Sequence, residues 1–263
     1  MLAPGPPRVL RPSQRCHHPG QNGGVANPEG GGLRSYIRLL HTSDLHLGRL
    51  ERDDGHGTWP LEQMLQTAIG AHADAVLLCG DIFDHNRVQD KLLKEALALL
   101  GQLRVPTIIL PGNHDCLCPG SVYERMEALG LPDHLHIIRP EKGLVTLPQL
   151  DLAIWGRAHD SYNDMRPLED IPAPSKERWQ VAMAHGHLVR GAWDLQRSYL
   201  IFPDQIAASS RTYVALGHWE LPHQIEVGDV VAAYCGAPDR TGHVLLVELD
   251  HKVKIRPYPL PGH

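Results

Sequence analysis

Short apolar runs alternate with amphipathic stretches along the first half of the chain. Three of these runs have the length and composition of buried strands: YIRLLHTS (36–43), AVLLC (75–79) and VPTIIL (105–110). Between and after them, apolar residues recur at helical spacing over residues 60–72, 88–103 and 121–130. This alternation of strand and helix predicts a sheet flanked by helices.

Each predicted helix should bury one side only. The expected buried stripes are Leu61, Leu65 and Ile69 in the first helix, and Leu92, Leu93, Leu97 and Leu100 in the second. Pro60 suits the first turn of its helix, and Gly130 suits the end of the third.

The second half is richer in strand. The candidates are residues 134–138, 150–155, 179–185, 212–217, 223–227, 230–235, 243–249 and 252–258. Together the two halves predict an α/β fold in which two mixed sheets pack on each other and carry helices outside, a four-layer α/β/β/α sandwich. Residues 1–35 are rich in glycine and proline and have no apolar period, so we predict a disordered tail (1–35) and one domain (36–263).

Composition excludes several classes of protein. The 263 residues contain 25 Lys+Arg against 30 Asp+Glu, a net charge of −5, which gives no support to broad electrostatic capture of nucleic acid. No apolar run reaches the roughly 18 residues of a membrane helix, so no membrane contact is expected. Five irregularly spaced cysteines argue against a disulfide framework. No segment resembles a secretory signal, and a cytoplasmic location is therefore expected.

Metal-ligand residue types follow five of the predicted strands. The motifs are Asp44-Leu45-His46, GDIFD (80–84), GNHD (112–115), AHGH (184–187) and GHWE (217–220). Each motif alone is ordinary turn chemistry, but strand ends meet at one edge of an α/β sheet. Their common position therefore predicts one metal site at that edge.

The order of these motifs resembles the calcineurin-like metallophosphoesterases. The wording HTSDLHLG (41–48) followed by GDIFD (80–84) is most similar to the branch that contains the SbcD-type nucleases, and the resemblance spans residues 38–250. It implies two divalent metals that activate a bridging hydroxide for attack on a phosphoester.

The resemblance also implies roles for single residues. One metal would take Asp44, His46 and Asp81, and the other Asp81, Asn113, His185 and His218, so that Asp81 bridges the two. His114 would be the catalytic residue beside the leaving oxygen, and Asp84 and Asp115 would orient ligand histidines. Nitrogen and oxygen ligands without thiolate suit Mn²⁺, Fe, Zn²⁺ or Mg²⁺, of which we favour Mn²⁺.

One position departs from the family. Its last motif is usually GHxH, whose second histidine binds the first metal, but here Glu220 stands in that place. Either Glu220 replaces the imidazole as a ligand, which we favour, or it points elsewhere and the first site is weak. Arg87, Arg157 and His159 are candidates for lining the substrate cleft, since phosphate sites attract guanidinium groups, although an ordinary surface position is favoured for each arginine.

The motifs are less specific for the substrate than for the family. The nuclease branch carries a capping domain and coiled-coil contacts after its catalytic core, whereas this chain ends at His263, soon after its last predicted strands. We therefore expect a compact phosphodiesterase acting on small diesters or nucleic-acid ends. The alternatives are an SbcD-type DNA exonuclease and, less favoured because the ligand residues are all present, a noncatalytic scaffold; the oligomeric state stays open.

Overall fold

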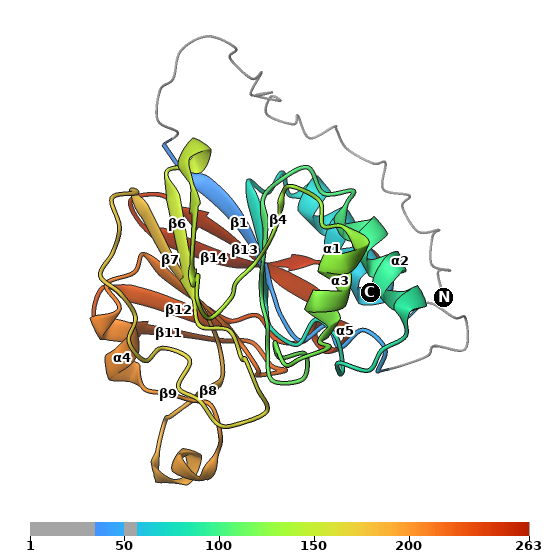
Figure 1. Ribbon diagram of the computed structural model, residues 1–263. Coiled ribbons are helices and arrows are strands. Elements are labelled where there is room, and N and C mark those ends of the chain that lie inside the picture. Colours follow the sequence, from blue (N-terminus) through green and yellow to red (C-terminus); the bar gives the residue numbers. More distant parts are fainter. Residues whose placement is uncertain (1–34, 50–56, 263) are drawn as a thin grey trace, which may run out of the picture. The chain divides into compact units, whose positions relative to one another are not determined.

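The computed structural model describes residues 35–49 and 57–262 (Figure 1). The described residues form one compact unit. All but the last residue of the predicted tail (1–35) lies outside them, so the division into a tail and a domain (36–263) stays a prediction.

The first of two six-stranded sheets combines the N-terminal strands with the last two of the chain. Its order is β14 (Val253–Pro259), β13 (His243–Leu249), β1 (Ile37–Thr42), β2 (Ala75–Cys79), β3 (Thr107–Leu110) and β4 (Leu135–Ile137). β1 to β4 run parallel, β13 pairs antiparallel with β1, and β14 pairs antiparallel with β13 at the edge of the sheet.

The second sheet is built from the rest of the second half. Its order is β11 (His223–Val227), β12 (Val230–Tyr234), β10 (Tyr213–Gly217), β7 (Trp179–His185), β6 (Leu152–Gly156) and β5 (Leu144–Leu147). The four inner strands are parallel and the two edge strands antiparallel. A separate short pair consists of β8 (His187–Leu188) and β9 (Leu200–Ile201).

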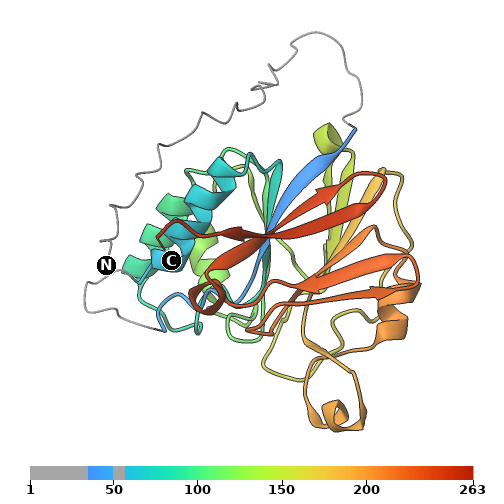
Figure 2. The ribbon, with the colours of Figure 1, turned by 180° about the vertical axis from the view of Figure 1, so that it is seen from behind.

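Helices cover the outer faces of both sheets. The first sheet carries α1 (Trp59–Gly70), α2 (Asp90–Leu100) and α3 (Val122–Leu129), and the second carries α4 (Pro203–Ala208). Figure 1 shows these helices on opposite sides of the two sheets, and the reverse view in Figure 2 agrees. The short α5 (Pro238–Thr241) precedes β13, and the 3₁₀ turns η1 (Pro148–Leu150) and η2 (Ala192–Gln196) complete the elements. The predicted α/β/β/α sandwich is confirmed.

Alternation along the strands divides the core into three layers. In β1, Leu39 faces the second sheet, and its neighbour Leu40 faces the helices. Ala182 and Val214 of the second sheet pack outward with Ile206 of α4. Because the central strands are buried on both faces, their sequences read as continuous apolar runs.

The structure corrects one predicted helix face. Ile69 is 60% exposed, although it was expected in the buried stripe with Leu61 and Leu65. Met64 and Ala68 complete the buried side instead, at the three- and four-residue spacing that points toward the sheet.

Several short elements had no clear signal in the sequence. They are β5, β8, β9, α4 and α5. β5 is an edge strand that is exposed at alternate positions, and the others have two to six residues, too few to set up a hydrophobic period.

No helix among the described residues is both long and apolar enough to cross a membrane. The cytoplasmic location stays a prediction.

The two sheets approach each other closely at the carboxyl ends of β2 and β10. A Cβ added at Gly217, the last residue of β10, would lie 1.9 Å from the carbonyl oxygen of Cys79, the last residue of β2. Only glycine therefore lets this edge close, and the metal-ligand motifs follow directly from it.

We predict that Gly217→Ala destabilises the protein by about 3 kcal/mol, because the added methyl must push two buried strands apart. Chemical denaturation measures the change. Gly70→Ala is the matched control: a Cβ there meets nothing within 4 Å, so its stability should stay within about 1 kcal/mol of the wild type. Equal stabilities of the two variants would contradict the close approach.

Candidate metal centre

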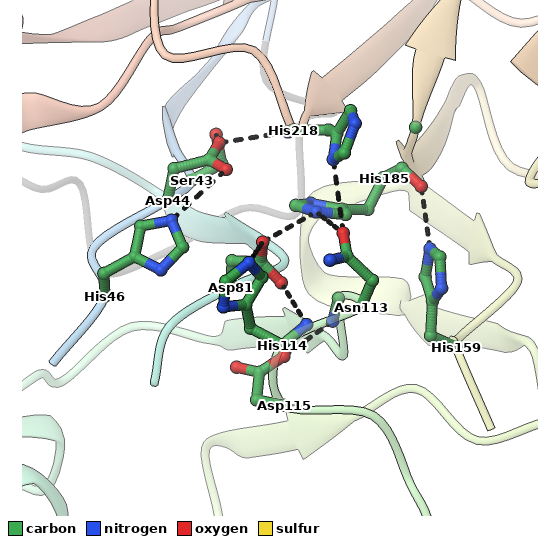
Figure 3. Close-up of polar contacts among 12 residues, drawn as sticks. Ser43, Asp44, His46, Asp81, Asn113, His114, Asp115, His159, His185 and His218 are labelled. Carbon is green, nitrogen blue, oxygen red and sulfur yellow. Dashed lines mark hydrogen bonds and ion pairs between the residues drawn. The ribbon is translucent and has the colours of Figure 1, made fainter. Parts of the chain in front are cut away.

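Five strand ends bring the predicted ligand residues to one place. Asp44 and His46 follow β1, Asp81 follows β2, and Asn113 follows β3. His185 ends β7, and His218 follows β10 in the second sheet. Figure 3 shows these side chains converging at the edge where the sheets meet.

The backbone at four of these residues is left-handed. The φ angles are 55° at Asp44, 45° at His46, 52° at Asp81 and 96° at His218. Such conformations cost non-glycine residues about 1–3 kcal/mol each and persist only where the surroundings enforce them. Here hydrogen bonds between motifs do so: Asp44 N donates to the Gly80 carbonyl and His46 N to the Asp81 carbonyl, both at 3.0 Å. His218 N donates to Asp44 Oδ2, also at 3.0 Å.

The donor atoms form two clusters that share one residue. Asp44, His46 and Asp81 make the first, and Asp81, His185 and His218 the second; within each, the ligand atoms lie within 4.8 Å of one another. Asn113 joins the second, because its Oδ1 is 3.1 Å from His185 Nε2 and 3.2 Å from His218 Nδ1. Asp81 thus occupies the position expected of a bridging carboxylate. A third group, His46, Asp84 and His114, lies beside the first.

The surroundings of the Asp81 carboxylate indicate whether the two clusters fit a cation. Asp81 is 2% exposed. Burial alone would raise its pKa, but His185, with Nε2 3.1 Å from Asp81 Oδ2, lowers that pKa below its usual range. Reciprocally, burial would lower the pKa of His185, but the Asp81 charge raises it to about 9. The surroundings of Asp81 therefore favour a positive charge beside its carboxylate, and a cation fits this requirement.

The histidines are prepared for ligation. His185 Nδ1 lies 2.8 Å from the Cys79 carbonyl and must donate a hydrogen bond to it, so Nε2 is the atom left for a metal, whose binding would displace the Nε2 proton. Burial and the nearby His185 lower the pKa of His218 to about 3, so its imidazole stays neutral, as a ligand must be. The donor set of oxygen and nitrogen without thiolate suits the metals considered above, and does not choose among them.

Glu220 lies apart from both clusters. Its Oε1 is 3.2 Å from Arg49 Nη1, and its Oε2 is 2.6 Å from Arg240 Nη1. Two guanidinium groups thus hold its carboxylate, and Glu220 belongs to none of the clusters of ligand atoms found among the described residues. Its role as a metal ligand stays a prediction.

Asp84 and Asp115 support the site differently. Asp84 Oδ1 is 3.2 Å from His46 Nδ1, consistent with orienting that histidine. Asp115, expected to orient a histidine as well, instead accepts hydrogen bonds from the backbone N–H of Ile82, Phe83 and Gly112 and from the Tyr123 hydroxyl, at 2.7–3.1 Å. It ties the loops after β2 and β3 together. Burial and the Asp81 charge raise its pKa to about 6.

A cleft of about 570 Å³ opens beside the clusters. It is lined by Asp84, His85, Asn86, Arg87, Asn113, His114, Tyr162 and Tyr199. Arg87 is one of these lining residues, and the His114 side chain is 43% exposed. Asn86 and Tyr162 were not predicted; the hydrogen bond between Asn86 Nδ2 and the Tyr162 hydroxyl, at 3.1 Å, joins residues far apart in sequence.

Arg157 and His159 do not line that cleft. Arg157 pairs with Glu169 and Asp170 at 3.4 and 3.6 Å. His159 is fully buried, with Nε2 2.8 Å from the His185 carbonyl. Its expected contact with substrate is therefore corrected to a support for the strand end that carries His185.

Comparison with known proteins agrees with this geometry. The family model for calcineurin-like phosphoesterases matches residues 37–229. The DNA double-strand break repair protein Mre11 of Aeropyrum pernix is 28% identical over 86% of this chain and 53% of its own, and that of Archaeoglobus fulgidus is 25% identical over 78% and 50%. The SbcD component of the SbcCD nuclease of Bacillus subtilis is 23% identical over 77% and 61%. The chain spans about half the length of these two Mre11 proteins.

Solved structures show the same fold. A protein of Thermus thermophilus matches with a TM-score of 0.57 and 16% identity, over 84% of this chain and 98% of its own. A dimetal phosphatase from Danio rerio matches with a TM-score of 0.53 and 12% identity, over 85% and 96%.

We predict that Mn²⁺ raises the melting temperature of the protein by about 5 °C or more at a hundredfold excess over its Kd, because an ion that binds only the folded state stabilises it. Asp81→Asn should abolish most of the rise, since Asp81 belongs to both clusters. Asp133→Asn, an exposed control, should keep it. Calorimetric scans with and without Mn²⁺ test this, and an undiminished rise in Asp81→Asn would contradict the shared ligand.

Proposed function

Because the chain belongs to the calcineurin-like phosphoesterase family, we propose that it is a dinuclear-metal-dependent phosphodiesterase. The observation that carries the proposal is the pair of ligand clusters that share Asp81, with His114 beside them. One cation would be held by Asp44, His46 and Asp81, and the other by Asp81, Asn113, His185 and His218. We propose Mn²⁺ as the metal.

Cations bound there neutralise the phosphoryl oxygens and lower the pKa of the attacking water. The protein's own residues hold the candidate ligands in fixed positions relative to one another. Asp115 joins the loops that carry Asp81 and Asn113, and the Cys79 carbonyl orients the His185 ring. This preorganisation supports catalysis because little rearrangement is needed when the phosphoester binds.

His114 is proposed to protonate the leaving oxygen. Its Nδ1 is 2.8 Å from the Asp84 carbonyl, which must accept a hydrogen bond from it. Nε2 is then the atom that faces the clusters, 4.0 Å from Asp81 Oδ2, and it gives a proton to the substrate from the imidazolium form of the ring. Its backbone N–H also donates to Asp81 Oδ1 at 2.9 Å, which holds the side chain next to the reaction.

The cleft favours a diester over a monoester. Arg87 is the one arginine or lysine among its lining residues, and Asp84 adds a carboxylate. The single negative charge of a diester can be paired by that one guanidinium, whereas the second charge of a dianionic monoester would find no further arginine or lysine among the lining residues. The volume also leaves room for a second substituent on phosphorus.

The alternative substrate is DNA. The names of the Mre11 and SbcCD relatives support an exonuclease that acts on nucleic-acid ends. The excess of acidic residues favours small diesters or short ends over long duplexes.

We predict that the protein with Mn²⁺ hydrolyses bis(p-nitrophenyl) phosphate faster than p-nitrophenyl phosphate. With a diester whose leaving group is an alkoxide, such as dithymidine phosphate, His114→Ala should lower kcat by about 10²–10⁴-fold through loss of the proton donor. His251→Ala, whose side chain is 86% exposed on the surface, should keep the wild-type rate. A panel of cyclic nucleotides and of single- and double-stranded DNA then separates the two substrate classes.

Three outcomes would change the proposal. Preference for the monoester would contradict the diesterase, and rapid degradation of DNA would promote the exonuclease. No turnover with Mn²⁺, Fe²⁺, Zn²⁺ or Mg²⁺ would favour the noncatalytic scaffold.

A further inference from the structure

The Glu220 carboxylate gathers two arginines from distant parts of the chain. Arg49 and Arg240 approach its two oxygens at 3.2 and 2.6 Å. The three side chains are 44%, 53% and 31% exposed for Arg49, Arg240 and Glu220. They form a group at the protein surface that we call the arginine rim.

The arginine rim is connected through the backbone to the Asp44 and His46 side of the candidate metal centre. Glu220 comes two residues after His218, whose backbone N–H is bonded to Asp44. Arg49 comes three residues after His46, and its N–H donates to the His46 carbonyl at 3.0 Å. Both rim residues are therefore held by turns that begin at candidate ligands.

The backbone fixes the third member as well. The Glu220 carbonyl accepts from Ala237 N at 3.1 Å, immediately before α5, which carries Arg240. The preceding residue, Trp219, stacks on Tyr234 with centroids 4.5 Å apart and donates to His187 Nδ1 at 3.1 Å. The turn that presents Glu220 is thus anchored on both sides, and a third guanidinium, that of Arg190, lies 4.6 Å over the Trp219 ring.

This arrangement argues against ligation by Glu220. To reach a cation, the carboxylate would have to leave two guanidinium groups, and these would then be unpaired beside added positive charge. While it stays, it occupies Nη1 of each arginine. A guanidinium has five N–H donors in a planar fork, so each arginine retains donors that suit a phosphate.

We propose that Glu220 is a positioning residue that holds Arg49 and Arg240 to bind a second phosphate of the substrate, next to the one that is cleaved. This rests on the proposed phosphodiesterase function. The second phosphate can be a terminal phosphomonoester or the next phosphodiester of a chain, since both present the same oxygens. One carboxylate against two guanidinium groups leaves a net positive charge on the arginine rim. Glu220 aligns the two arginines and does not bind a metal.

The first test is metal binding by titration calorimetry of the full chain with Mn²⁺. Glu220→Gln keeps the size of the side chain and should bind Mn²⁺ with the wild-type stoichiometry and a Kd within about twofold. Asp44→Asn should weaken the binding at least tenfold. Loss of one ion, or a tenfold weaker Kd, in Glu220→Gln would overturn the proposal and make Glu220 a ligand.

The second test compares dithymidine phosphate (TpT) with the same diester carrying a 5′-phosphate (pTpT) and with TpTpT. The wild type should prefer one or both longer substrates by about tenfold in kcat/KM, equivalent to about 1.4 kcal/mol. Arg49→Gln combined with Arg240→Gln should reduce that ratio to nearly one, with the loss in KM. Preference for pTpT identifies a terminal phosphate, and preference for TpTpT an internal one.

Arg38→Gln is the matched control, an arginine at the opposite end of β1 that pairs with Glu248 at 3.7 Å. It should keep the wild-type ratio. The role of the arginine rim is refuted if the wild type shows a kcat/KM ratio near one, or if the double variant keeps the wild-type ratio. Turnover of TpT in the same experiment would leave the proposed function intact. Failure of the wild type to cleave any of the diesters refutes the proposed function itself.

Discussion

The carboxylate of Asp81 is buried where the two sheets meet, and a buried negative charge is tolerated only among groups that compensate it. That compensation comes from both sheets: the His114 N–H from the loop after β3, and the His185 ring from the end of β7. Both must approach closely, which is why glycine stands at two positions beside them. A Cβ at Gly112 would lie 2.2 Å from Asp81 Oδ1, and one at Gly80 would lie 2.2 Å from His185 Nδ1.

The same requirement explains which parts of the fold the sequence predicts. A site between two sheets needs central strands covered on both faces, and such strands appear as uninterrupted apolar runs at 75–79 and 179–185. Ligands that meet at one edge of a sheet follow the strands directly in sequence. Asp44, Asp81 and His218 can therefore be located from the apolar run that precedes each of them. The sequence therefore predicts both the motifs of the candidate metal centre and the strands that position them.

The directions in which the side chains point cannot be predicted from the local sequence pattern. Asp115 stands beside the ligand motif, yet its oxygens face three backbone N–H groups and Tyr123, because the loops after β2 and β3 fold over it. His159 follows a strand of the second sheet and is fully buried, since its ring reaches the carbonyl of His185 on the neighbouring strand. Glu220 is turned by Arg240, which is placed by a hydrogen bond between turns that the sequence does not pair.

The electrostatic surroundings of the candidate metal centre are likewise set by neighbouring groups. A net charge of −5 predicts weak attraction of long polyanions, and that follows from the summed field of the chain. Within a Debye length of about 8 Å in physiological salt, however, only neighbouring groups count. There Arg49 and Arg240 face one carboxylate, and they come from the two ends of the described chain. On the proposed function, such a group would discriminate between substrates by one or two phosphates near the candidate metal centre, whereas the net charge of the chain adds no attraction for a long nucleic acid.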